Sequence, residues 1–91
     1  PPQKKHDFIM DEEERLKWFM YEQYRKILHA FKNGDPITDL NWDAQTTLNG
    51  KLVKLELAPH QSGFILSCQS PFSTLTLLIN TSGKFSSYET P

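Results

Sequence analysis

The chain has 91 residues, of which 37% are hydrophobic and 23% are charged. This length and composition allow one small domain with a single hydrophobic core and exclude a two-domain protein. The formal net charge of −1 at pH 7 removes the usual electrostatic reason for binding a polyanion such as nucleic acid. No apolar stretch reaches the roughly 20 residues that a membrane-spanning helix requires, so we expect no membrane partner.

Residues 1–10 begin with two prolines and end with the apolar run Phe8, Ile9 and Met10. We interpret them as a lead segment that is either flexible or anchored through its apolar end. The first residue is Pro and not Met, so we expect the chain to be a domain excised from a longer protein. Residues 11–91 are then a single α+β interaction domain.

A long helix is predicted from Asp11 to Asn33. Asp11 is suited to cap its start, and Glu14 follows at the spacing of a capping box. Gly34 can adopt the left-handed conformation that closes a helix, and Pro36 blocks any continuation. One face carries, at helical spacing, the apolar residues expected to cover a sheet, namely Leu16, Phe19, Met20, Tyr24, Ile27, Leu28 and Phe31.

The second half of the chain has the composition of β-strands. Asn49 and Gly50, between two strand-like runs, predict a tight hairpin of type I′. Alternation of apolar and polar residues and richness in strand-forming residues predict further strands over residues 51–58, 64–69, 74–80 and 85–89.

Pro59, Gly63 and Pro71 are interpreted as breaks between these strands. The connections are short, which permits only antiparallel neighbours. The expected fold is therefore α+β, with one long N-terminal helix packed on an antiparallel meander sheet of four to five strands in two layers.

The opposite side of the helix carries a second stripe, formed by Trp18, Tyr21, Arg25 and His29. Trp, Tyr and Arg dominate binding hot spots because they offer a large contact area with a polar end. We predict that these four residues bind a partner. A structural alternative stays open, in which residues 1–10 or the end of the meander cover Trp18 and Tyr21, with Arg25 lying over them.

The last predicted strand is a second candidate surface. It contains Phe85, Ser87 and Tyr88, and within it there is no lysine or proline, the residues that usually discourage pairing at a sheet edge. We predict that this edge can add a strand from a partner or from a second copy of the chain.

Candidates for catalysis or metal binding are few. Cys68 lies on the apolar side of a predicted strand, where a thiol behaves as a small buried group, and His60 lies in a loop. The histidines at positions 6, 29 and 60 form no catalytic motif with Cys68 and lack zinc-ligand spacing. We expect no catalytic residue, no metal and no cofactor.

The sequence predicts a non-catalytic protein–protein interaction or assembly domain, an adaptor or scaffold that can dimerise. Its expected partner is another protein or a second copy, and no small-molecule substrate is expected. One alternative is single-stranded nucleic-acid binding through the aromatic residues of the strands, Phe64, Phe72, Phe85 and Tyr88. Only three lysines follow Pro36, so phosphates would meet little compensating charge.

A third hypothesis is an accessory domain of an enzyme, supported only by His60 and Cys68. The single cysteine excludes an intrachain disulfide and favours a reducing compartment. We therefore expect an intracellular protein, cytoplasmic or nuclear.

Overall fold

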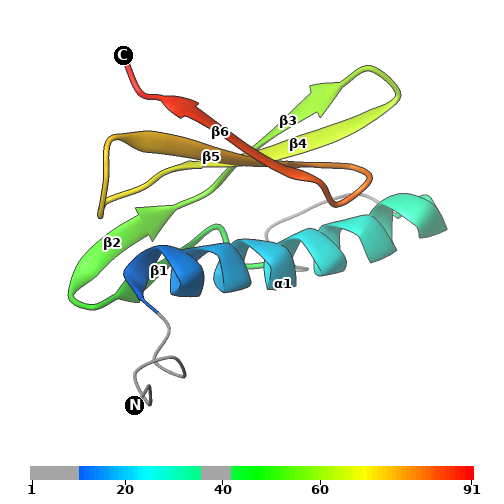
Figure 1. Cartoon of the computed structure of the whole chain (residues 1–91). Helices are drawn as coiled ribbons and strands as arrows, with labels where there is room; N and C mark the ends of the chain where they lie inside the picture. Colours follow the sequence, from blue (N-terminus) through cyan, green and yellow to red (C-terminus); the bar gives the residue numbers. More distant parts are fainter. Residues whose placement is uncertain (1–10, 36–41) are drawn as a thin grey trace, which may run out of the picture.

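The computed structural model describes residues 11–35 and 42–91. Its elements in chain order are α1 (Glu12–Asn33), β1 (Gln45–Leu48), β2 (Lys51–Lys54), β3 (Glu56–His60), β4 (Gly63–Gln69), β5 (Leu75–Asn80) and β6 (Phe85–Glu89). Strands β3, β4, β5 and β6 form one antiparallel sheet in that order, and β1 and β2 form a separate hairpin. The helix lies along one face of the larger sheet (Figure 1). The predicted α+β architecture is confirmed, whereas the predicted lead segment, residues 1–10, lies outside the described residues.

Both ends of α1 form as their local signals predict. The Asp11 side chain accepts a hydrogen bond from the Glu14 backbone N–H at 2.8 Å, which satisfies one of the donors left open at a helix start. Gly34 closes the helix with a φ of 74°, a left-handed conformation that glycine adopts without steric cost.

The predicted strand over 51–58 is interrupted at Leu55. Its first half, β2, pairs with β1 across a turn in which Asn49 and Gly50 have φ values of 53° and 79°, as a type I′ turn requires. Its second half pairs with β4. The chain thus passes from the hairpin to the main sheet at Leu55.

The predicted break at Pro59 is wrong, because β3 runs through it to His60. Leu55 donates its N–H to the carbonyl of Ala44 at 2.7 Å, away from β4. Backbone groups of alternate residues point the same way, so Leu57 and Pro59 also face away from β4. Pro59 has no N–H, and at this position the sheet loses no hydrogen bond.

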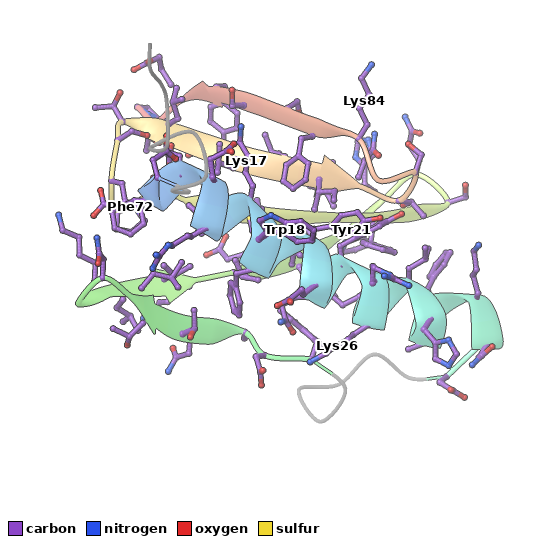
Figure 2. The ribbon with its side chains drawn as sticks, turned by 60° about the horizontal axis from the view of Figure 1, so that its bottom comes forward. Lys17, Trp18, Tyr21, Lys26, Phe72 and Lys84 are labelled. Carbon is purple, nitrogen blue, oxygen red and sulfur yellow. The ribbon has the colours of Figure 1, made fainter. Side chains whose placement is uncertain are left out.

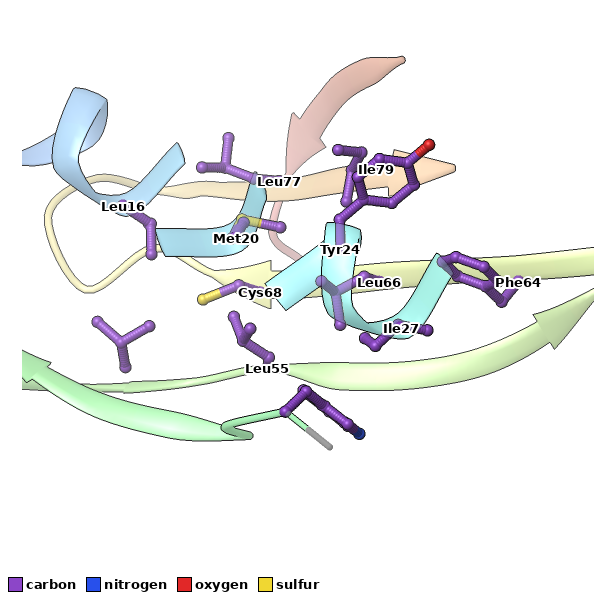
Figure 3. Packing of buried hydrophobic residues seen from close by; sticks show 12 residues of the cluster. Leu16, Met20, Tyr24, Ile27, Leu55, Phe64, Leu66, Cys68, Leu77 and Ile79 are labelled. Atoms are coloured by element: carbon purple, nitrogen blue, oxygen red, sulfur yellow. The ribbon is translucent and has the colours of Figure 1, made fainter. Parts of the chain in front are cut away.

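The core lies between α1 and the sheet (Figure 3). Leu16, Met20 and Ile27 are fully buried on the helix. They belong to one cluster with buried residues of β4, β5, β2 and the residue that follows β2. These residues are Phe64, Leu66, Cys68, Leu77, Ile79, Val53 and Leu55. Phe31, predicted in the buried stripe, is exposed, but its ring packs edge-on against Phe64 with centroids 5.5 Å apart.

Three polar side chains of the helix fix how it is rotated on the sheet. Near its start, Glu13 accepts hydrogen bonds from the hydroxyls of Ser70 at 2.6 Å and Ser73 at 3.0 Å. In its middle, Gln23, only 2% exposed, accepts the backbone N–H of Asp43 at 2.7 Å. The hydroxyl of the next residue, Tyr24, donates to the carbonyl of Thr81 at 2.8 Å.

Truncating the centre of the helix stripe tests this packing. We expect Met20→Ala to lower the free energy of unfolding by about 2–5 kcal/mol, since the side chain is fully buried and its removal leaves a cavity. The exposed control Lys26→Ala, on the same helix, should change it by less than about 0.5 kcal/mol. Urea denaturation measures both, and equal effects would contradict the buried orientation of Met20.

Candidate functional site

The four residues of the predicted helix stripe are all exposed, but they divide into two groups. Trp18 is 58% exposed and Tyr21 37%, and both line one shallow hollow. Arg25 and His29 border a different, wider hollow further along the helix. The two aromatic residues thus share one hollow, which Arg25 and His29 do not line.

A series of ring contacts connects Trp18 and Tyr21 to the core. The ring of Trp18 meets that of Tyr21 edge-on with centroids 6.3 Å apart, and Tyr21 lies 5.6 Å from Tyr24. Tyr24 in turn lies 6.0 Å from the buried ring of Phe64. Burial, with a smaller effect of Tyr21, raises the pKa of the Tyr24 hydroxyl, which therefore keeps the proton that it donates to Thr81 at neutral pH.

Phe85, at the start of β6, lines the same hollow as Trp18 and Tyr21. Its side chain packs against the core cluster, so it lies on the face of the sheet that carries the helix. The structural alternative predicted that the end of the meander covers the two helix aromatics; Phe85 borders them, but both are exposed. Any covering by residues 1–10 lies outside the described residues. Figure 2 shows Trp18 and Tyr21 side by side on α1.

Among the described residues, β6 is an outer strand of the four-stranded sheet and pairs with β5 alone. Thr90 donates its N–H to the carbonyl of Thr74 at 2.8 Å, and the carbonyl of Lys84 accepts the N–H of Asn80 at 3.2 Å. Since antiparallel ladders alternate, even-numbered residues of this segment bond to β5. The backbone N–H and C=O groups of Phe85, Ser87 and Glu89 therefore point toward the open edge.

The opposite edge of the sheet, formed by β3, has fewer free backbone groups than the β6 edge. Leu55, which immediately precedes β3, donates its outward N–H to the carbonyl of Ala44, just before the hairpin. Pro59, an outward position within β3, has no N–H to donate. Proline on an outer strand discourages a further strand from pairing. Within residues 11–35 and 42–91, the two edges of this sheet are thus unequal, because the outward backbone groups of β6 include no proline.

The two surfaces predicted separately, the helix stripe and the strand edge, meet at Phe85. We call the side chains of Trp18, Tyr21 and Phe85 together with the outward backbone of β6 the aromatic edge. Of the predicted edge residues, Phe85 and Ser87 face the helix side, whereas Tyr88, 51% exposed, lies on the opposite face by strand alternation.

The residues considered for chemistry do not meet. Cys68 faces the core, whereas His60 lies on the other side of the sheet, since its neighbour Pro59 pairs with the inward-facing Phe64. No group of three or more His, Cys, Asp or Glu side chains in the described part of the chain could hold a metal ion. The described helix is not apolar enough to cross a membrane.

The aromatic residues considered for nucleic-acid stacking are also dispersed. Phe64 is buried beneath the helix, and Phe85 lies on that same inner face. Tyr88 lies on the outer face, and Phe72 is half-buried in the connection between β4 and β5. No single open face of the sheet presents these four rings together.

The buried thiol gives a prediction with a pH dependence. Burial raises the pKa of Cys68 from 9.0 to about 11, so the native thiol should resist alkylation by iodoacetamide at pH 8 and react once the chain is unfolded. Between pH 9 and about 11 the unfolded thiol ionises while the folded one keeps its proton, so stability falls as pH rises through this window.

Urea denaturation across this pH range measures the effect, and in Cys68→Ala the contribution of the thiol should disappear. Tyr24 also ionises in alkali and is retained in both chains, so the difference between them isolates Cys68. Rapid alkylation of the native protein would contradict the buried position.

No protein-family model, curated protein or solved structure matches this chain. What the aromatic edge can do therefore follows from its own side chains and backbone.

Proposed function

We propose that this domain is a non-catalytic protein-interaction module, an adaptor or assembly unit that binds another protein chain through the aromatic edge. The observation that carries the proposal is the hollow in which Trp18 and Tyr21 of the helix meet Phe85 of the outer strand. Three aromatic side chains lie there directly beside backbone groups that can pair with an added strand.

The side chains suit this role energetically. Exposed Trp and Tyr rings provide contact area with few rotatable bonds, so little conformational entropy is lost when a partner fixes them. Tyr21 is also held by the ring contact with Tyr24, which is bonded to Thr81. A surface that is ordered before binding loses less free energy on association than a flexible one.

The backbone suggests how the partner lies. An extended segment added to β6 would bond to the outward groups of Phe85, Ser87 and Glu89, which gives affinity without demanding a particular sequence. Every second side chain of that segment would face the helix side, because strand residues alternate. One of these side chains can then enter the hollow beside Trp18 and Tyr21 and supply the specificity.

Removing the two helix aromatics tests the proposal. We expect Trp18→Ala/Tyr21→Ala to weaken partner binding by roughly tenfold to a hundredfold, since hot-spot aromatics each contribute more than about 1 kcal/mol. The immobilised domain and its variants are compared for the proteins that they retain, and the affinity of each retained protein is then measured. Circular dichroism confirms that each variant is folded.

The matched control is Arg25→Ala/His29→Ala, which removes two exposed side chains of the same helix outside the hollow. This control should retain the partners of the unaltered domain. If the aromatic variant binds as the unaltered domain does, or if only the control loses its partners, the aromatic edge is not the binding site.

A further inference from the structure

We propose that the occupant of the aromatic edge is a second copy of this chain, joined through an antiparallel pairing of β6 with its symmetry mate. This inference rests on the proposed function and specifies its partner. The result would be a continuous eight-stranded sheet, with both helices on one face.

The backbone of β6 is suited to a two-fold axis. The strand runs from Phe85 to Glu89, and its central residue, Ser87, is one whose N–H and C=O point to the open edge. An axis through Ser87 pairs each Phe85 with Glu89 of the other copy and Ser87 with itself. Every residue of the strand is then paired, and the three outward residues of each copy all find partners.

The side chains at this axis leave room for the approach. The Ser87 side chain lies on the helix side of the sheet, and Ser86 lies on the opposite face, where it would come beside Tyr88 of the other copy. Small residues at the centre of the pair leave space on the helix side. The two copies of Trp18 and Tyr21, which lie next to β6, can fill this space from both sides.

The charges at the aromatic edge are compatible with self-contact. The hollow is bordered by one anion and one cation, Glu14 and Lys17, so two copies meet there without net repulsion.

The unequal edges of the sheet limit the assembly to two chains. Pro59 and the bond from Leu55 to Ala44 disfavour pairing at β3. Within the described residues, a dimer through β6 therefore leaves no equivalent edge on the four-stranded sheet, and the assembly closes instead of growing through that sheet into a filament.

Light scattering after size-exclusion chromatography, over a wide range of protein concentration, tests the dimer directly. We expect a monomer–dimer equilibrium in the unaltered chain. Ser87→Pro should weaken it by about thirtyfold or more, since the symmetric pair loses both Ser87 N–H bonds. This substitution removes no bond to β5, because the Ser87 N–H faces outward. Ser87→Ala keeps that N–H and should dimerise as the unaltered chain does.

Cross-linking tests the register independently of the proline. In Ser87→Cys the two thiols face each other across the axis, at the Cα separation of about 5.5 Å that a disulfide accepts, so mild oxidation should give a covalent dimer. In Glu89→Cys the corresponding residues are about 13 Å apart along the paired strands and should not link. The unaltered chain, with only the buried Cys68, is the background control.

A monomer at all concentrations, equal dimerisation of Ser87→Pro, or no difference between the two cysteine variants would each overturn the second-copy proposal. Binding of a different protein that is lost in Trp18→Ala/Tyr21→Ala, together with a strictly monomeric chain, would keep the proposed function and reject only the self-pairing. If Trp18→Ala/Tyr21→Ala loses neither dimerisation nor binding of another protein, both the second-copy proposal and the proposed function are rejected.

Discussion

The seating of α1 on the sheet is the constraint on which the rest of the structure depends. The buried stripe of Leu16, Met20 and Ile27 supplies the contact with the core, but apolar packing alone tolerates some rotation and sliding. The hydrogen bonds that Glu13 and Gln23 accept, and the one that Tyr24 donates, tie the helix to three separate segments and remove that freedom. A rotation by one residue, about 100°, would break all four hydrogen bonds.

This fixed rotation determines which side chains reach solvent and where. Trp18 and Tyr21 emerge on the side of the helix that borders β6, beside Phe85. Tyr24 contacts both the sheet and the helix, because its hydroxyl donates a hydrogen bond to Thr81 in the β5–β6 turn while its ring contacts Tyr21. Tyr24 thus fixes the position of the helix aromatics relative to β6, and two elements distant in sequence form one surface.

The sequence was sufficient for features that local chemistry determines. The Asp11 cap, the Gly34 closure and the Asn49-Gly50 turn follow from residues that favour one backbone conformation, and all form as predicted. The break at Pro59 was wrong because the cost of proline depends on whether its N–H would have faced a neighbouring strand. That direction follows from strand pairing, which a single strand does not reveal.

The candidate site was predictable only in part. Trp18 and Tyr21 were found by helical spacing, and Phe85 by the absence of protective residues in the last strand. Their meeting could not be found, since it depends on the helix rotation that distant polar contacts fix. Burial of Gln23 was missed for the same reason, because its partner, the Asp43 backbone, lies 20 residues away. That Arg25 lines a different hollow from Trp18 and Tyr21 likewise depends on tertiary contacts, because Phe85 of β6 lies beside the aromatic pair and not beside Arg25.

The central claim is that Trp18 stands open to solvent on a rigid domain, and acrylamide quenching of tryptophan fluorescence measures this directly. The chain has two tryptophans, of which Trp42 is buried and Trp18 exposed, so Trp42→Phe and Trp18→Phe report on each alone. In dilute native protein, where no second copy is bound, we expect Trp18 to be quenched nearly as strongly as in the unfolded chain and Trp42 to be protected. Equal protection of the two tryptophans would mean that the chain covers its own aromatic edge, and would contradict the account.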